Sequence, residues 1–155
     1  MPAADAPVIR RAGASDLDAA TRLFEGYQAF YGREHPAGAA RAFLAERFDK
    51  HDSVVLLAWR ADAAVGFVQL YSSFASLSLA PSWILNDLFV EPSSRGRGVA
   101  RALMEAVRQL ARESGAAEVF LQTARDNAEA RALYQSLGYR LDEHFLVYTL
   151  DPRIA

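Results

Sequence analysis

The chain has 155 residues, a formal net charge of -2, an apolar fraction of 52% and a charged fraction of 23%. This length suits one domain with a buried core, and the composition excludes a disordered tail or a fibrous repeat. The absence of cysteine excludes disulfides, thiolate nucleophiles and cysteine-ligated metal sites. Because there is no basic excess, nucleic acid is not an expected partner.

No membrane segment or targeting segment is expected. The apolar stretches are far shorter than a membrane span, and residues 1–7 show no basic region followed by an apolar block. We therefore expect a cytoplasmic protein with no membrane partner. The three histidines are scattered and lack the spacing of metal ligands, so no metal site is expected.

The first half of the chain predicts one strand, two helices and a hairpin. Val8–Arg11 is expected to be a strand, and Ser15 the N-cap of a helix with one apolar face. A second helix is predicted over about residues 38–48. Two runs rich in β-forming residues, 54–59 and 65–71, predict an antiparallel hairpin.

The second half alternates strands and helices, after a serine-rich segment at 72–82 that is predicted to be a loop. The remaining elements are a strand at 83–90, a turn at 93–98, a helix ended by Ser114-Gly115, a strand at 119–123, a helix capped by Asn127 and a strand at 145–150. This order predicts a single α/β domain with a mixed sheet over residues 1–155, with its core at about 8–150.

The turn at residues 93–98 carries the most chemical information, because it contains two glycines and leads from a strand into a helix. The first turn of a helix presents unpaired backbone N–H groups and partial positive charge, and glycine lets a ligand approach closely. With Arg95 and Arg97 beside Gly96 and Gly98, this turn suits a phosphate or pyrophosphate. On the turn alone, a plain surface turn with arginines is an equal alternative.

Two motifs resemble those of the GNAT superfamily of N-acetyltransferases. Arg95-Gly96-Arg97-Gly98-Val99-Ala100 resembles the Arg/Gln-x-x-Gly-x-Gly/Ala pyrophosphate loop, and Leu88-Phe89-Val90 before it resembles the fourth strand. Asn127, Ala130, Tyr134 and Leu137-Gly138-Tyr139 resemble the second cofactor motif. The spacing of the motifs and the order of the elements match over about residues 8–150.

The resemblance implies a GNAT-like α/β fold, with a central mixed, mostly antiparallel sheet that splays between its fourth and fifth strands. It implies acetyl-CoA as the cosubstrate, with the pantetheine arm alongside the fourth strand. The cofactor-binding residues that it implies are Leu88, Phe89, Val90, Arg95, Gly96, Arg97, Gly98, Val99, Ala100 and Asn127.

Tyr134 has two interpretations. By itself it is a structural residue of an amphipathic helix. The resemblance implies instead that its phenol is the general acid that protonates the departing CoA thiolate. Asn127 is an N-cap on local grounds and a cofactor ligand by resemblance, and the two roles are compatible.

Asp87 is an unusual polar residue in an apolar strand. Period-two alternation predicts that Trp83, Leu85, Asp87 and Phe89 share one face. A buried carboxylate needs a partner or a purpose. Either it orders the neighbouring loop or it contacts a cationic amine, and both interpretations stay open.

Residues 83–90 also resemble the branch of the superfamily that includes diamine and amino-acid acetyltransferases. That branch often has an acidic residue where Asn86 stands, so a carboxylate base at this position is in doubt. We expect direct acetyl transfer to a small primary amine, a polyamine or an amino acid, with Tyr134 and Asp87 as catalytic residues. The alternatives are transfer to a protein N-terminus or lysine, and a non-catalytic CoA-binding module. A homodimer is also expected.

Overall fold

The computed structural model describes residues 6–154, which fall into two compact units, Met1–Gln122 and Thr123–Ala155. The single domain expected over residues 1–155 therefore stays a prediction. Residues 1–5 and 155 lie outside the described residues, which therefore include only part of the segment 1–7, where no targeting signal is expected.

The first unit is built on a five-stranded mixed sheet, whose strands lie in chain order. The strands are β1 (Val8–Arg11), β2 (Val54–Arg60), β3 (Ala63–Ala75), β4 (Ala80–Val90) and β5 (Glu118–Leu121). The pairs from β1 to β4 are antiparallel, whereas β4 and β5 are parallel. The predicted mixed, mostly antiparallel sheet is confirmed.

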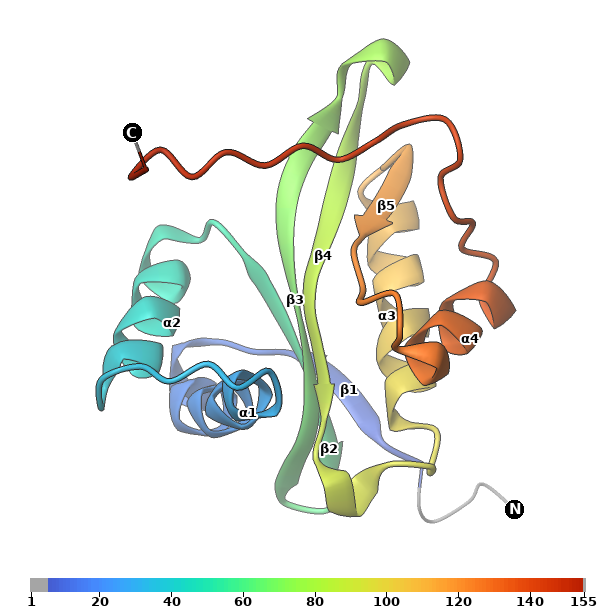
Figure 1. The fold of residues 1–155 in the computed structure, drawn as a ribbon. Coiled ribbons are helices and arrows are strands. Elements are labelled where there is room, and N and C mark those ends of the chain that lie inside the picture. The colour runs from blue at the N-terminus through green and yellow to red at the C-terminus, as the bar shows by residue number, and fades with distance from the viewer. Residues whose placement is uncertain (1–5, 155) are drawn as a thin grey trace. The chain divides into compact units, whose positions relative to one another are not determined.

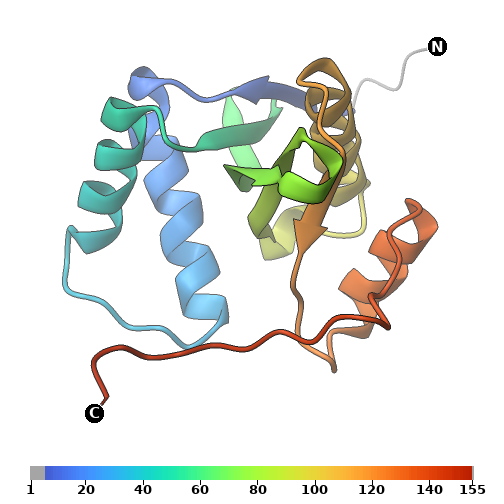
Figure 2. The ribbon, with the colours of Figure 1, turned by 90° about the horizontal axis from the view of Figure 1, so that it is seen from above.

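Helices cover both faces of this sheet (Figures 1 and 2). α1 (Leu17–Phe30) and α2 (Ala39–Lys50) lie on one face, and α3 (Val99–Glu113) lies on the other. The core on the α1 face includes Leu23 and Phe67, while α3 buries a stripe of apolar residues along its length. Because both faces are covered, the middle strands are buried on both sides, as the unbroken burial of most of β2 shows.

The start of α1 differs from the prediction. A 3-10 turn, Ala14–Asp16, precedes the helix, so Ser15 lies inside this turn and is not an N-cap. The Asp16 carboxylate accepts the Gly13 N–H at 2.9 Å and two Arg10 guanidinium nitrogens at 2.8 and 3.0 Å. Arg10 thereby holds the pKa of Asp16 below its ordinary value. A bidentate ion pair is a stronger local organiser than a serine hydroxyl.

Residues 72–82 form a hairpin, so the predicted loop is wrong. β3 and β4 both continue into this segment, side by side, and the 3-10 turn Ser76–Ser78 joins them. Their ladder includes the pair Ser73 and Ser82. Serine is a weak strand former, but an antiparallel neighbour supplies backbone hydrogen bonds that local propensity does not register.

The second unit contains α4 (Ala128–Ser136). Asn127 caps this helix as predicted, since its Oδ1 accepts the Ala130 N–H at 3.2 Å. Gly138 follows the helix with φ of +89°. The strand predicted at residues 145–150 is wrong: the strands of the described chain are β1 to β5, and this segment belongs to none. A strand needs a neighbour for its backbone hydrogen bonds, and β-forming residues alone do not supply one.

Candidate active site

The turn between β4 and α3 has the geometry of an anion site. Gly96 and Gly98 have φ of +72° and +76°, a region that glycine adopts without strain. A Cβ at either position would meet no atom within 4 Å, so the space in front of them is open. Gly98 is the N-cap of α3, and the first intrahelical bond runs from the Ala102 N–H to its carbonyl at 3.0 Å. The N–H groups of Val99 and Ala100 lie ahead of that bond, at the positive end of the helix dipole.

The two arginines of this turn play different parts. The Arg95 side chain turns back to the end of β4, where its Nε donates to the Val90 carbonyl at 2.9 Å. Its guanidinium lies 5.1 Å from the ring centre of Phe30 and 5.7 Å from that of Phe89. Arg95 therefore ties the turn to β4, while the exposed side chain of Arg97 remains beside the glycines.

β4 and β5 part halfway along β4, which confirms the predicted splay. Their ladder joins Ser82–Leu85 to Glu118–Leu121 and stops, whereas β4 continues to Val90. Within the first unit, the β5 side of residues 88–90 therefore has no strand beside it. Backbone N–H and C=O groups on such an edge are available to an extended ligand.

A β-bulge lies where the two strands part. In the β3–β4 ladder Asp87 pairs with Gln69, but Leu85 pairs with Leu70, so Asn86 is an extra residue in β4. A bulge reverses the faces that the following residues would otherwise occupy. The period-two pattern of the sequence cannot predict this bulge, because the bulge is defined by the pairing of β4 with β3.

The bulge makes the predicted common face of β4 wrong. Trp83 lies on the α3 face, where its indole N–H donates to Ser114 Oγ at 2.8 Å. Phe89 lies on the α1 face, with its ring centre 6.4 Å from that of Tyr27. Phe89 lies two residues after Asp87 in the same strand, so the two side chains share a face. Asp87 therefore faces α1, away from Trp83.

Asp87 belongs to a buried polar network on the α1 face. Gln69 Nε2 and Asn86 Nδ2 each donate to one of its carboxylate oxygens, both at 3.1 Å. Ser53 Oγ in turn donates to Gln69 Oε1 at 3.1 Å. Asp87 is 5% exposed and Gln69 is 0% exposed. Amide donors on both oxygens offset the cost of burying this carboxylate and fix its position.

Sequence reasoning missed Gln69 and Ser53 as partners of Asp87. A signal existed for Gln69, because it is the single polar residue in the apolar run at 65–71. Ser53 gave none, since it precedes the strand in an ordinary polar segment.

Aromatic side chains of α1 lie on the same face as this network. The Tyr27 ring centre is 5.0 Å from that of Tyr31 and 5.8 Å from that of Phe67. Tyr31 and Phe30 are about half exposed, so this aromatic group reaches the surface. A carboxylate and aromatic rings on one face of the sheet suit a cationic group.

Burial raises the pKa of Tyr71 to about 12, and the charge of Asp87 adds to this rise. Below the ordinary tyrosine pKa of about 10, the phenol keeps its proton whether the protein is folded or unfolded. Between that value and about 12 only the unfolded chain loses the proton, so stability falls as the pH rises. Tyr71→Phe is expected to reduce this fall. The measurement is the free energy of unfolding from urea titrations at about pH 9 and about pH 11. The control is Tyr31→Phe, which makes the same change at a half-exposed tyrosine. An equal loss of unfolding free energy between the two pH values in wild type and Tyr71→Phe would contradict the expectation.

Tyr134 and Asn127 lie in the second unit. Tyr134 is half-buried, with its ring centre 5.9 Å from that of Tyr139. Its carbonyl accepts the N–H groups of Leu137 and Tyr139 at 3.1 and 3.0 Å. The Asn127 side chain acts as the cap of α4. Their roles towards the cosubstrate stay predictions.

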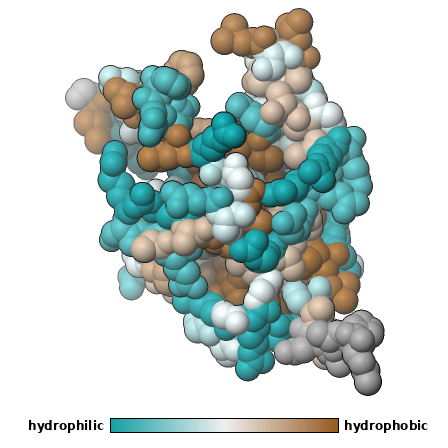
Figure 3. Space-filling model, turned by 90° about the vertical axis from the view of Figure 1, so that its right-hand side faces the viewer, coloured by the Kyte–Doolittle hydropathy of each residue, from teal (hydrophilic) through white to brown (hydrophobic). Residues whose placement is uncertain are grey.

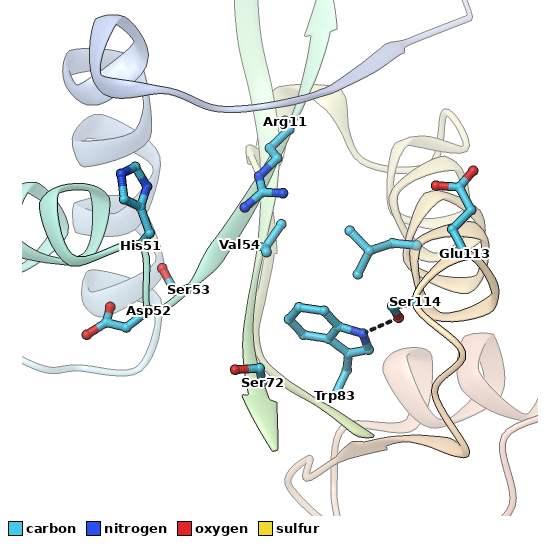
Figure 4. A pocket seen from close by; sticks show the side chains of 10 residues that line it. Arg11, His51, Asp52, Ser53, Val54, Ser72, Trp83, Glu113 and Ser114 are labelled. Atoms are coloured by element: carbon cyan, nitrogen blue, oxygen red, sulfur yellow. Dashed lines mark hydrogen bonds between the residues drawn. The ribbon is translucent and has the colours of Figure 1, made fainter. Parts of the chain in front are cut away.

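A cleft of 350 Å³ lies between the segment that joins α2 to β2 and the C-terminal part of α3 (Figure 4). Its charged and titratable lining includes Arg11, His51 and Glu113, and Trp83 forms part of its wall. Ser53 also lines this cleft and donates to Gln69, so the cleft adjoins the polar network that holds Asp87.

Two further observations hold for residues 6–154. They contain no group of three His, Cys, Asp or Glu side chains placed to hold a metal ion. None of their helices is both long enough and apolar enough to cross a bilayer.

The parted strands and the glycine turn have the geometry of proteins that hold a pyrophosphate-bearing ligand along an open strand edge. Residues 20–139 match the model of the acetyltransferase (GNAT) family, and the chain belongs to this family. The residues fit acetyl-CoA as cosubstrate, because the turn offers N–H donors to the pyrophosphate and β4 offers a free edge to the pantetheine arm. The protein is thus an acetyl-CoA-dependent N-acetyltransferase.

Individual relatives agree with this assignment. The chain is 41% identical over 143 residues to an uncharacterized N-acetyltransferase, YhfO, of Bacillus subtilis, covering 92% of this chain and 96% of that protein. It is 28% identical to the D-amino-acid N-acetyltransferase HPA3 of Saccharomyces cerevisiae, covering 90% and 88% of the two chains. The crystal structure of a probable acetyltransferase superposes with a TM-score of 0.88 at 40% identity, covering 93% of this chain and 97% of that one.

Proposed function

We propose that the protein acetylates a primary amine of a small cationic molecule, a polyamine or an amino acid, by direct transfer from acetyl-CoA. The observation that carries this proposal is the buried Asp87, which both of its amide neighbours hold in place on the aromatic α1 face. A fixed carboxylate on the same face of the sheet as aromatic rings suits an ammonium group. The yeast relative, which is named for D-amino acids, supports the amino-acid class.

In this proposal the backbone does most of the cosubstrate binding. Acetyl-CoA supplies an activated thioester. The N–H groups of residues 95–100 hold its pyrophosphate, the β4 edge at 88–90 holds the pantetheine arm, and Asn127 adds a hydrogen bond. A backbone N–H near Leu88 stabilises the developing oxyanion. Holding the amine and the thioester in position supplies much of the rate gain.

Two side chains handle protons in this proposal. The amine arrives as an ammonium ion, and Asp87, through water, takes up the proton that must leave before attack. The Tyr134 phenol donates a proton to the departing sulfur. Neither role needs a metal ligand or a cysteine.

We also propose that the two units form one GNAT domain, and that the protein works in the cytoplasm as a homodimer. The family model supports the first of these, because its match runs from residue 20 to residue 139 and so includes parts of both units.

Asp87→Asn is expected to raise the KM for cationic acceptors by roughly 10-fold or more, while the affinity for acetyl-CoA stays within about 2-fold. The change removes the charge and keeps the shape. Initial rates with one cationic and one neutral acceptor, measured on the same variant, provide the check.

Gln69→Leu is the matched control for Asp87→Asn, because it removes one donor to the carboxylate and keeps the charge. It should lower stability and impair cationic acceptors less. Equal losses on cationic and neutral acceptors in Asp87→Asn would remove Asp87 from the acceptor site.

An acetyl-transfer screen tests the proposed acceptor class. Thiol release would be measured with polyamines, amino acids, aminoglycosides and peptides. Activity with peptides alone would replace the small-molecule acceptor with a protein acceptor. Binding of acetyl-CoA without transfer to any amine would favour a non-catalytic module.

A further inference from the structure

The cleft of 350 Å³ beside α3 has no part in the proposed reaction, yet it has the size of a ligand site (Figure 4). Small-molecule sites have volumes of about 300–1,000 Å³. The lining comes from the end of β1, the segment before β2, the β3–β4 hairpin and the end of α3. All of these belong to the first unit, so the cleft is a property of that unit alone.

One wall of this cleft is apolar and fixed in place. The Trp83 indole N–H donates to Ser114 Oγ at 2.8 Å, and that hydroxyl donates to the Ala111 carbonyl at 3.1 Å. Val54 and Leu110 add aliphatic lining. The hairpin that carries Trp83 continues past the cleft to a projecting hydrophobic tip (Figure 3). A ligand with an apolar side chain would gain free energy by covering the wall.

Two side chains of opposite charge lie on the two sides of the cleft. Arg11 ends β1 and Glu113 ends α3, and Trp83 lies below and between them (Figure 4). In the described part of the chain, the Arg11 guanidinium has no hydrogen-bonded or ionic partner. Glu113 accepts the Gln109 amide at 2.8 Å and pairs with no cation among these residues. Both charges are therefore available to a ligand.

The other two titratable groups of the lining do not change this balance. Asp52 is engaged by Arg47, whose Nε lies 3.1 Å from its Oδ1, and its carboxylate is turned away from Trp83 (Figure 4). His51 precedes Asp52 on the side opposite Glu113, so any positive charge that it carries adds to that of Arg11. The cleft thus offers a cation on one side and an anion on the other.

We propose that this cleft binds a small zwitterion, a free amino acid with an apolar side chain. The ligand's carboxylate pairs with the Arg11 guanidinium, whose N–H groups form a fork that suits a carboxylate. Its ammonium group pairs with Glu113, and its apolar side chain covers Trp83 and Leu110. A ligand with only one of the two charges leaves the other charge of the cleft without a partner.

This site is distinct from the proposed acceptor site. Neither Asp87 nor Gln69 lines the cleft. Ser53 connects the two places, because it lines the cleft and donates to Gln69 at 3.1 Å. The amino acid is therefore an additional ligand beside the network that holds Asp87, whatever the acceptor is.

Fluorescence of Trp83 reports binding directly, because the chain has only one other tryptophan, Trp59. A Trp59→Phe chain is titrated with L-leucine in the absence of acetyl-CoA, and a saturable change in emission is expected. Isocaproate lacks the ammonium group and isopentylamine lacks the carboxylate, so each should bind roughly 10-fold or more weakly. Calorimetric titration of wild-type protein with the same compounds replaces this measurement if Trp59→Phe does not fold.

Each charge of the cleft is tested by its own variant. Arg11→Gln should weaken leucine binding by roughly 10-fold or more and leave isopentylamine binding unchanged. Glu113→Gln should weaken leucine binding to a similar extent and leave isocaproate binding unchanged. Arg112→Gln is the matched control, because Arg112 is exposed beside Glu113 and does not line the cleft. It should bind leucine as wild type does.

Three results would overturn the proposal. The first is no saturable change up to about 10 mM leucine. The second is equal affinity for leucine and isocaproate. The third is a leucine signal that Asp87→Asn abolishes and Arg11→Gln retains, which would place the amino acid in the acceptor site. The proposed acetylation survives the first two results and gains support from the third, because none of these measurements involves acetyl transfer.

Discussion

Gly98→Asp is expected to abolish the stabilisation of the protein by acetyl-CoA. A ligand at 100 times its Kd stabilises the folded state by about 2.7 kcal/mol, which raises the Tm of a chain of this size by roughly 5–10 °C. The new carboxylate would stand at the N-terminus of α3, where the pyrophosphate is expected, and would repel it at close range. Thermal unfolding of both proteins with and without acetyl-CoA measures the effect.

Gly115→Asp is the matched control for this substitution. Gly115 follows the other end of α3, its φ is +69°, and a Cβ there also meets no atom within 4 Å. The two variants therefore share a strained left-handed backbone, which costs about 1–3 kcal/mol in each. Only Gly98→Asp should lose the response to acetyl-CoA. A full response in a folded Gly98→Asp protein would show that the pyrophosphate binds elsewhere.

Tyr134→Phe is expected to lower kcat by roughly 10²-fold or more, because it removes the hydroxyl that would protonate the departing thiolate. The ring remains, so its aromatic contact with Tyr139 and the affinity for acetyl-CoA should change little. Single-turnover kinetics are needed, since product release can conceal a slower chemical step.

Tyr139→Phe makes the same chemical change on the partner ring of that pair. It should retain nearly full turnover, because the resemblance assigns the acid role to Tyr134 alone. Near-normal chemistry in Tyr134→Phe would return this residue to a purely structural role. Similar losses in both variants would point to the packing of the second unit instead of proton transfer.

Local sequence signals succeeded where neighbouring residues along the chain decide the structure. The turn before α3 needs two glycines for positive φ, and both have it. The Asn127 cap depends on an N–H only three residues away. Both features concern backbone groups whose partners are close in sequence, so composition and spacing suffice to predict them.

Two predictions failed because a strand depends on a paired neighbour and not on its own composition. Residues 72–82 contain poor strand formers, yet each strand of that hairpin has the other beside it. Residues 145–150 contain good strand formers, yet have no ladder within the described chain. In both cases pairing, and not propensity, decides whether a strand exists.

The sequence by itself determined the family, the α/β order of elements and the glycine turn, because these follow from local backbone requirements and from motifs with fixed spacing. Only the tertiary structure decided which way Asp87 faces, because a single bulge at Asn86 reverses the alternation of β4. It also decided that Arg95 ties the turn to Val90, and that Gln69 shares the buried carboxylate. Gln69 and Asp87 become neighbours only when β3 and β4 pair, and no pattern along the chain encodes that register.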